Sequence, residues 1–275
     1  MRYWNKELRM RRLFSDDKTV MVALDHGQGG VKPGLEHPEK LLNTIIDANP
    51  DAVLLSGGMA RRFNYLFGGK GKPSLVISTD FILHGSIPQL EGQGEEIHQS
   101  ISVEECVRLG ADAIKALLVF GRRDTRIVAE NMAYITRLAE ECNHWNLPLI
   151  VEPTTWGGLL TDEMKRDVSL YSHMARISAE LGADLVKIDF IGTSEEFKQV
   201  LDNCPVPVAI LGGSKASAED IANTIIEANK CGVCGVVFGR NVWQSKDPEK
   251  MIDALKAITY TNDREKYFKI IEEIE

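Results

Sequence analysis

The segment LGADLVKIDFIG at residues 181–192 passes from the end of a helix-period stretch, through a glycine, into an apolar run that carries one lysine. The segment LGADAIKALLVFG at 109–121 repeats the same order of features. Apolar runs without polar alternation are typical of parallel strands that are buried on both faces. We interpret both segments as helix-to-strand junctions. Their likeness favours a duplicated half-barrel, although any two junctions that begin with Leu-Gly-Ala-Asp resemble each other.

The same junction recurs along the whole chain. Eight β-rich runs are expected at Val20–Asp25, Ala52–Ser56, Leu75–Thr79, Ala113–Val119, Leu149–Glu152, Asp184–Asp189, Val208–Leu211 and Gly235–Phe238. Helical periodicity predicts intervening helices at Pro38–Ala48, Val103–Leu109, Ile127–Cys142, Tyr171–Leu181, Ser194–Leu201 and Ala218–Ala228, the last capped by Ser217. This alternation over ~250 residues predicts an α/β fold, a (β/α)8 TIM barrel in a single domain.

An open, doubly wound sheet is the alternative, and the fingerprint GxGxxG that such sheets carry after their first strand is absent. The barrel should cover roughly residues 19–252, with short extensions at both ends. The C-terminal extension, 253–275, is amphipathic. We expect each extension either to cap the barrel or to pack on a second subunit.

Composition excludes several classes of protein. The 275 residues are 44% hydrophobic, too apolar for a disordered chain, and the net charge of −8 repels nucleic acid. No apolar stretch approaches the ~20 residues that span a bilayer, and the charged start is unlike a secretory signal. The odd number of cysteines argues against a disulfide framework. We expect a cytoplasmic protein whose thiols are reduced, with Cys231 and Cys234 packed in the core.

Metal and cofactor sites are not indicated. The six histidines form no HxxxH or HxH pair, so a metal would need ligands from separate loops. The loop at 68–72 contains Gly-Lys but lacks the following Ser or Thr of a phosphate-binding P-loop. We predict neither a metal nor an organic cofactor.

Active sites of TIM barrels lie at the C-terminal ends of the strands. The polar residues at those positions are Asp25, His26, Ser56, Asp80, Glu152, Thr154, Lys187, Asp189, 212–215 and 239–241. Lys187 is the most informative, because an ammonium among apolar strands is costly and its pKa should fall. A neutral lysine attacks a ketone to form a Schiff base. The alternative is a lysine that only forms an ion pair, with Asp25 or Asp189.

Four further residues are candidates for supporting roles. Lys115 is the counterpart of Lys187 in the repeated segment, and it either acts electrostatically or pairs with a carboxylate. Asp25 is suited to positioning a substrate hydroxyl or relaying a proton, and His26 to acting as a base. Glu152 is a general acid or base if its apolar strand raises its pKa, or else the ion-pair partner of either lysine.

Two glycine-containing loops predict a phosphate site. Gly212, Gly213 and Ser214 follow the seventh strand, and Gly239 and Arg240 follow the eighth. Loops at these two strands commonly bind phosphate in TIM barrels, through backbone N–H groups and nearby cations. A phosphorylated substrate is therefore favoured over two ordinary turns that contain glycine.

The motifs ALDHG at 23–27, ADLVKIDF at 183–190, PVPVAILGGSK at 205–215 and GVVFGRNVWQ at 235–244 occur in this order. Together they resemble class I aldolases of the archaeal fructose-bisphosphate aldolase type and their DeoC-, FbaB- and LacD-like relatives. The resemblance covers most of the barrel. It implies that Lys187 is the Schiff-base lysine, Asp25 the acid after the first strand, and the two glycine loops the phosphate cradle. It also implies a homo-oligomer, often a decamer, without a metal or cofactor.

The chain departs from this pattern after the fifth strand. Archaeal fructose-bisphosphate aldolases have a general-acid Tyr there, and Thr154 takes its place in EPTTWG at 152–157. The Glu-Pro pair is similar to that of tagatose-bisphosphate or sulfofructose-phosphate aldolases, which implies Glu152 as the proton-transfer residue. The DHG segment also resembles the thiolase of autoinducer-2 phosphate breakdown, in which His26 and Lys187 would promote acyl transfer from a phosphorylated dicarbonyl to coenzyme A.

The leading hypothesis is a cofactor-free lyase, a class I aldolase that cleaves or forms a carbon–carbon bond in a phosphorylated ketose-like substrate through Lys187. The thiolase and a non-catalytic phosphosugar-binding barrel are the alternatives. Loops around Arg61, 80–94 and 121–126 should decide which substrate is recognised.

Overall fold

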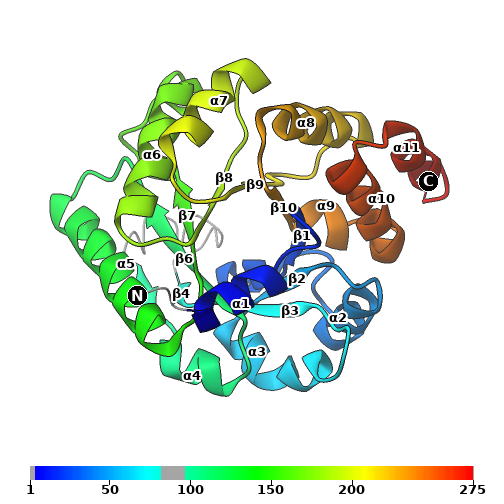
Figure 1. Ribbon diagram of the computed structural model, residues 1–275, viewed down its shortest axis with the longest axis horizontal. Coiled ribbons are helices and arrows are strands. Elements are labelled where there is room, and N and C mark those ends of the chain that lie inside the picture. Colours follow the sequence, from blue (N-terminus) through cyan, green and yellow to red (C-terminus); the bar gives the residue numbers. More distant parts are fainter. Residues whose placement is uncertain (1–3, 82–96, 275) are drawn as a thin grey trace.

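A closed barrel of parallel strands forms the centre of the computed structural model, which describes residues 4–81 and 97–274 (Figure 1). Its strands are β1 (Thr19–Ala23), β2 (Ala52–Ser56), β3 (Ser74–Ser78), β6 (Ala113–Val119), β7 (Leu149–Thr154), β8 (Leu185–Ile188), β9 (Val208–Leu211) and β10 (Gly235–Phe238). They pair in the order β1-β10-β9-β8-β7-β6-β3-β2, and β2 pairs back with β1. The predicted (β/α)8 barrel is confirmed.

Helices surround the barrel. They are α2 (Pro38–Asp47), α3 (Gly57–Phe63), α4 (Val103–Arg108), α5 (Thr125–Trp145), α6 (Val168–Glu180), α7 (Ser194–Asn203), α8 (Ala218–Cys231) and α10 (Pro248–Thr261). Further helices are α1 (Trp4–Arg12), α9 (Arg240–Trp243), α11 (Arg264–Glu272) and the 3₁₀ helices η1 (Asp25–Gly29), η2 (Asn64–Phe67) and η4 (Met164–Arg166). Among the described residues, no helix is both long and apolar enough to cross a membrane.

The helices begin where side chains satisfy their free N–H groups. Ser217 accepts a hydrogen bond from the backbone of Asp220, as its predicted capping role requires. Thr193 and Glu196 form a reciprocal capping box at the start of α7. The sequence did not predict α3, where Ser56 is the N-cap and accepts from the backbone N–H of Met59.

The predicted C-terminal extension has two different parts. Helix α10 packs against both α8 and α2 and completes the outer ring of the barrel, so the ring extends past the expected boundary at residue 252. Helix α11 lies outside this ring, packed on α10 and α8. Its Tyr267 is fully buried and donates a hydrogen bond to the carbonyl of Ala218. The extension therefore packs on its own chain.

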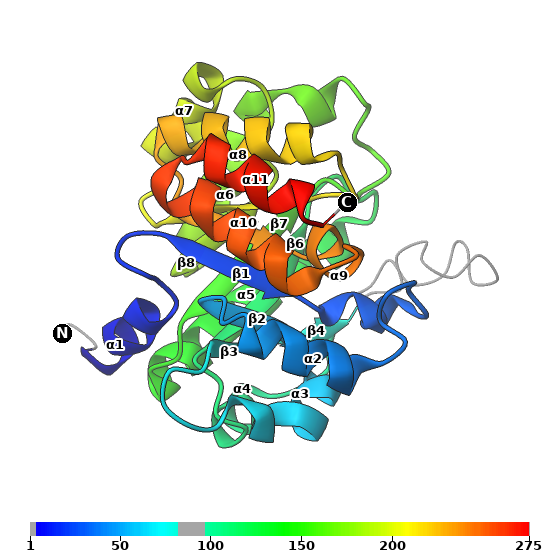
Figure 2. The same cartoon turned by 90° about the vertical axis from the view of Figure 1, so that its right-hand side faces the viewer.

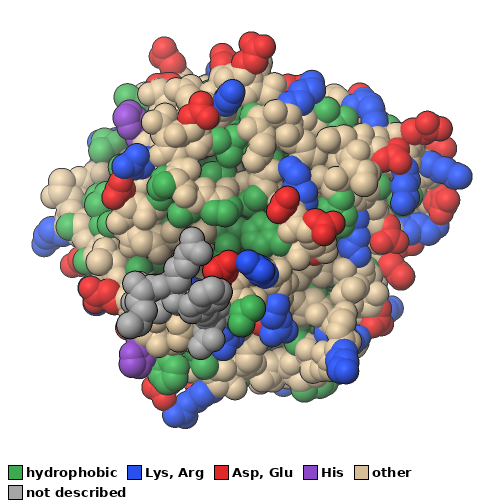
Figure 3. All heavy atoms as spheres, viewed as in Figure 1, with side chains coloured by type: hydrophobic (Ala, Val, Ile, Leu, Met, Phe, Trp, Pro, Cys, Tyr) green, Lys and Arg blue, Asp and Glu red, His purple; other side chains and the backbone are tan. Residues whose placement is uncertain are grey.

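The N-terminal extension closes one end of the barrel. Leu13 is fully buried against an interior layer formed by Met21, Ala23, Ala52, Leu54, Val76, Ala113, Ile150, Leu185, Ala209 and Val237. Ion pairs fix α1 beside it: Lys6 lies 2.7 Å from Asp184, and Arg12 lies 2.9 Å from Asp112. Figure 2 shows α1 at the end where β1 starts. Figure 3 views this end, with hydrophobic side chains near its centre and charged ones spread over its rim.

The cysteines of the CxxC segment pack on different sides of the barrel wall. Cys234 packs against the interior layer, and Cys231 packs against the outer hydrophobic core. The five cysteines are free thiols. This confirms core packing for both residues.

Two strand ends differ from the prediction by two residues. The first strand stops at Ala23, and Asp25 begins the 3₁₀ helix η1. The fifth strand continues through Pro153 and Thr154, which were expected in a turn. Proline lacks an N–H donor and is tolerated where no ladder bond is needed. The pairing of β7 with β8 ends at Val151, whereas the pairing with β6 continues to Thr154, so Pro153 lies where its missing donor is not required.

Candidate active site

A cavity of about 620 Å³ opens at the C-terminal ends of the strands. All ten predicted site residues line it: Asp25, His26, Lys115, Glu152, Lys187, Gly212, Gly213, Ser214, Gly239 and Arg240. Residues from β1, β6, β7, β8, β9 and β10 thus converge, as strand order requires in a closed barrel. Thr154, Asp189 and Trp243 also line the cavity, together with Gln28 and Lys32, which no sequence motif indicated.

Lys187 lies on β8 and is only 5% exposed. Its Nζ is 2.9 Å from Oε2 of Glu152 on the neighbouring strand β7. The ion-pair partner is therefore Glu152, and not Asp25 or Asp189, the partners expected from the sequence. The expectation that Glu152 pairs with an interior lysine is confirmed, and it pairs with both of them.

Lys115 lies at the centre of an acidic cluster. Its Nζ is 3.2 Å from Asp25, 3.3 Å from Glu152 and 3.8 Å from Asp80. Burial alone lowers the pKa of Lys115, but Glu152, Asp25 and Asp80 outweigh that effect and raise it. Lys115 therefore stays cationic, which suits an electrostatic role and not a nucleophilic one.

The two lysines determine the charge of the carboxyl groups. Burial raises the pKa of Asp25, yet Lys115 and His26 bring it down to about 2. Burial likewise raises the pKa of Glu152, and Lys187 and Lys115 lower it below its usual range. The idea that an apolar strand raises the pKa of Glu152 is therefore wrong, because two ammonium groups lie within 3.3 Å of its carboxylate.

Asp80 is the third carboxyl group of the cluster around Lys115. It is fully buried and accepts hydrogen bonds from the backbone N–H of Leu117 and the hydroxyl of Ser78. It also begins β4 (Asp80–Phe81), which pairs antiparallel with β5 (His98–Gln99). Of the loop expected to recognise substrate at 80–94, residues 82–94 lie outside the described residues.

Asp189 is the one carboxyl group of the cavity wall with neither a hydrogen bond nor an ion pair among the described residues. It lies two positions after Lys187, at the mouth of the barrel. Burial and the charge of Glu152 raise the pKa of Asp189 to about 6. A carboxyl group with this pKa exchanges its proton near neutrality.

His26 packs edge-on against Trp243, with 5.5 Å between the ring centroids. Its Nδ1 is 3.7 Å from Asp25, too far for a hydrogen bond. Burial lowers the pKa of His26, although Asp25 opposes the shift. The indole N–H of Trp243 donates to the carbonyl of Ala23 at 3.2 Å, which fixes the ring that supports the imidazole.

Buried Asn241 links the two loops of the predicted phosphate cradle. Its side-chain amide donates to the carbonyl of Gly212 at 2.8 Å and to that of Ser214 at 3.3 Å. Its carbonyl oxygen accepts from the backbone N–H of Ala216 at 2.9 Å. The sequence named Asn241 only as part of the loop after the eighth strand; its position in FGRN at 238–241 was the available signal.

The cradle also needs its glycines. A Cβ on Gly212 would lie 2.7 Å from the ring of Phe238, and a Cβ on Gly239 would lie 2.6 Å from the ring of His26. Gly213 has φ = 57°, a left-handed conformation that glycine adopts without strain. Beside these backbones, the Nε of Arg240 is buried without a hydrogen-bond partner among the described residues. Buried donors of this kind require an acceptor, and an anion supplies one.

Thr154, which the resemblance places where fructose-bisphosphate aldolases have a tyrosine, lines the cavity. Its Oγ1 is buried and has no hydrogen-bond partner within the described part of the chain. The hydroxyl is therefore placed to bind a substrate oxygen. Its own pKa lies far above that of a carboxyl group, so proton transfer falls to another residue.

The fold and the site define a TIM barrel whose cavity holds two buried lysines among carboxyl groups. A family model of the DeoC/LacD aldolases matches residues 13–245, and the chain belongs to that family. It is an aldolase. Two of its structural relatives are fructose-1,6-bisphosphate aldolases, one described as Schiff-base-forming and one with its catalytic lysine covalently bound to a carbinolamine intermediate.

Curated relatives align along nearly the whole chain. An uncharacterized aldolase of Saccharolobus solfataricus is 31% identical and covers 93% of this chain and 94% of its own length. The 2-amino-3,7-dideoxy-D-threo-hept-6-ulosonate synthase 1 of Archaeoglobus fulgidus is 30% identical, covering 94% and 92%. Among solved structures, a Schiff-base-forming fructose-1,6-bisphosphate aldolase is 28% identical with a TM-score of 0.78, covering 93% of this chain and 100% of its own.

Proposed function

We propose that this protein is a class I aldolase that makes or breaks a carbon–carbon bond in a phosphorylated ketose-like substrate, with Lys187 as the Schiff-base nucleophile. One observation carries the proposal. The Nζ of Lys187 contacts a carboxylate at 2.9 Å inside the cavity that the glycine loops and Arg240 also line. An amine with an adjacent proton acceptor and an anion cradle are the two parts that such a reaction needs.

The first step uses the pair of Lys187 and Glu152. When a ketone enters, Lys187 passes one proton to the Glu152 carboxylate, and the neutral amine attacks the carbonyl carbon. One proton moves from the new ammonium nitrogen to the oxygen, which gives the carbinolamine. The proton held by Glu152 then returns to the hydroxyl, water leaves, and the iminium forms. Lys115 remains 3.3 Å from Glu152 and supports its carboxylate form between turnovers.

The second step breaks the bond between the first and the second carbon beyond the iminium carbon. A base removes the proton of the hydroxyl on the far carbon, the carbon–carbon electron pair moves to the iminium as an enamine, and an aldehyde leaves. Glu152 is committed to two lysines and Asp25 to one, whereas Asp189 has no such partner. We assign this proton transfer to Asp189, beside Lys187 on the strand end. Protonation of the enamine carbon and hydrolysis then free Lys187.

Borohydride trapping tests the proposal at the level of a single lysine. Reduction of the enzyme with dihydroxyacetone phosphate or a ketose phosphate should attach the substrate to Lys187. A modified lysine resists trypsin, so the mass increase should appear on the joined peptide 177–198. Modification of Lys115 would instead mark the peptide 109–122. Labelling of that peptide, or of neither with any ketone phosphate, would contradict the proposal.

We expect Asp189→Asn to lower kcat by about 10²- to 10⁴-fold, the usual contribution of general acid–base catalysis. Asp189 must be ionised to accept the hydroxyl proton. The wild-type cleavage rate should therefore rise with pH through about 6, the pKa of Asp189, and the variant should lack this limb. Trapping on Lys187 should persist, because iminium formation precedes the step. Asp162→Asn, at an exposed loop position, is the control. An unchanged pH profile in Asp189→Asn would refute the assignment.

We expect Arg240→Met to raise KM for phosphorylated substrates by about 10- to 100-fold, the worth of a hydrogen bond to a charged group. Activity or trapping with unphosphorylated dihydroxyacetone should change little. Arg176→Met removes an exposed ion pair with Glu180 and serves as the control. Equal losses with both kinds of ketone would show that Arg240 does not bind phosphate.

The two alternative functions, a thiolase and a non-catalytic phosphosugar-binding barrel, remain predictions. Consumption of coenzyme A with a phosphorylated 2,4-dione, lost in His26→Ala, would favour the thiolase. Phosphosugar binding that survives Lys187→Ala, without turnover of any ketose phosphate, would favour the binding protein.

A further inference from the structure

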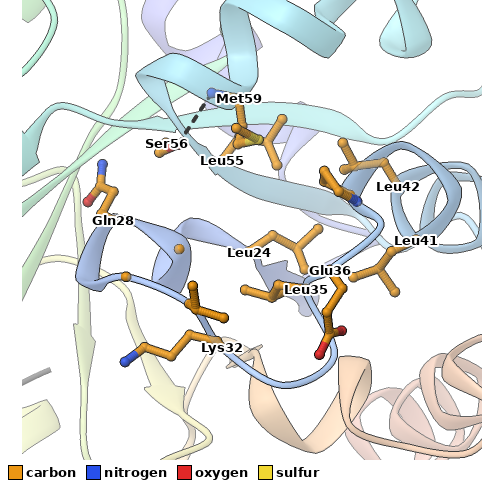
Figure 4. A pocket seen from close by; sticks show the side chains of 14 residues that line it. Leu24, Gln28, Lys32, Leu35, Glu36, Leu41, Leu42, Leu55, Ser56 and Met59 are labelled. Carbon is orange, nitrogen blue, oxygen red and sulfur yellow. Dashed lines mark hydrogen bonds between the residues drawn. The ribbon is translucent and has the colours of Figure 1, made fainter. Parts of the chain in front are cut away.

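A second cavity of about 490 Å³ lies beside the active site. It is enclosed by the loop that follows β1, the start of α2 and the end of β2 with α3 (Figure 4). Most of its wall is apolar: Leu24, Val31, Leu35, Pro38, Leu41, Leu42, Leu55 and Met59. At about 30 Å³ per water-sized group, the volume corresponds to about sixteen such groups. This space is large enough for part of a small molecule.

The second cavity shares part of its wall with the active site. Gln28 and Lys32 line both cavities, and Gln28 belongs to η1, the 3₁₀ helix that begins with Asp25. In Figure 4, Gln28 and Ser56 lie at one side of the cavity and Leu41 and Leu42 at the opposite side. A molecule that passes Gln28 therefore leaves the charged centre and enters an apolar space.

The charges of the wall select against a phosphate. Lys32 and Glu36 are the charged residues among those that line the second cavity, and they have opposite signs. The Ser56 hydroxyl already caps α3. The features of the phosphate cradle, glycine backbones with a buried arginine Nε, lie instead above β9 and β10. Because β10 neighbours β1, the anion site and the apolar cavity occupy adjacent parts of the same rim.

We propose that this cavity binds the carbon chain of the aldehyde partner at its end remote from the reacting carbonyl. The enzyme then joins a phosphorylated ketone, anchored at Arg240 and Lys187, to an aldehyde whose tail is apolar and unphosphorylated. This inference rests on the proposed aldol reaction and specifies its second substrate. Burial of one methylene favours binding about fourfold. The kcat/KM for aldehydes should therefore rise with each added methylene until the cavity is filled.

The test measures kcat/KM for the straight-chain aldehydes from acetaldehyde to octanal, with the phosphorylated ketone that labels Lys187 in the trapping experiment. We expect a rise of about threefold to fourfold per added methylene in the wild type. Leu41→Trp and Met59→Trp fill the cavity from two sides, at positions that are only partly buried. Both variants should flatten this rise and leave acetaldehyde unchanged. Leu159→Trp, an exposed position that lines neither cavity, should behave as wild type.

The outcomes separate this inference from the proposed function. A wild-type rate that does not depend on chain length, or a preference for glyceraldehyde 3-phosphate over every apolar aldehyde, would overturn the inference while trapping on Lys187 still succeeded. Tryptophan variants that lose activity with acetaldehyde and with octanal equally would also overturn the inference. If no ketone labels Lys187, the proposed aldol reaction fails, and this inference fails with it. Thermal unfolding of both tryptophan variants checks whether they remain folded.

Discussion

Lys187→Met is expected to abolish turnover, with kcat falling by about 10⁴-fold or more, as happens when a covalent nucleophile is removed. Methionine preserves the length and apolar stem of the side chain but cannot form an iminium. Glu152 keeps Lys115 at 3.3 Å, so its carboxylate remains paired and the barrel should stay folded. The measurement is single-turnover cleavage of the ketose phosphate that the wild-type enzyme uses.

Two controls make this result specific. Lys198→Met changes an exposed lysine on α7 and should retain full activity. Phosphate binding by Lys187→Met, measured by equilibrium titration, should persist because Arg240 and the glycine loops are intact. Cleavage within tenfold of the wild-type rate would show that Lys187 is not the nucleophile.

Lys115→Met is expected to destabilise the protein by about 3–5 kcal/mol, the usual result when one partner of a buried ion pair is removed. Asp25, Asp80 and Glu152 lie within 3.8 Å of the lost ammonium. At about 2–4 °C per kcal/mol for a chain of 150–250 residues, Tm should fall by roughly 10 °C. Calorimetric unfolding at pH 7 measures the change.

The destabilisation should depend on pH with a defined sign. Lys115 depresses the pKa of Asp25 to about 2 from an ordinary 3.8, so the stability gained is fully present above about pH 4. It is lost as pH falls toward 2. The Tm difference between wild type and Lys115→Met should therefore be largest near neutrality and shrink below pH 4. Lys250→Met breaks an exposed pair with Glu273 and should cost at most about 1 kcal/mol. Equal Tm values for the two variants would refute a structural role for Lys115.

The barrel could be predicted because its signals are local in sequence. Continuous apolar runs located all eight strands, and the bounds of β2, β6, β9 and β10 matched the prediction. The C-terminal end of each strand determines which residues face the mouth of the barrel. Lys187 and the glycine loops could therefore be predicted as cavity residues without knowledge of distances. Helix α3 was not predicted, because its short sequence, GGMARRF at 57–63, begins with two glycines and has weak helix propensity.

The charge state of the site could not be predicted in the same way. It depends on which side chains meet across the barrel. Glu152 was identified as a candidate, but its pKa is set by two lysines on neighbouring strands, and the direction of the shift is opposite to that expected from its own strand. Asp189 is similar, since the role proposed for it rests on its having no ion-pair partner among the described residues. Asn241 joins two loops through backbone carbonyls, a role that no residue pattern encodes.

The plug formed by Leu13 and α1 has a kinetic consequence. The described residues block that end of the barrel and fill its interior, so in the proposed cleavage both products leave through the mouth at the C-terminal ends of the strands. In the proposed reaction, the product without a covalent bond leaves first, and the product attached to Lys187 follows only after hydrolysis. Product release is therefore sequential, and hydrolysis of the product bound to Lys187 determines when the next substrate can bind.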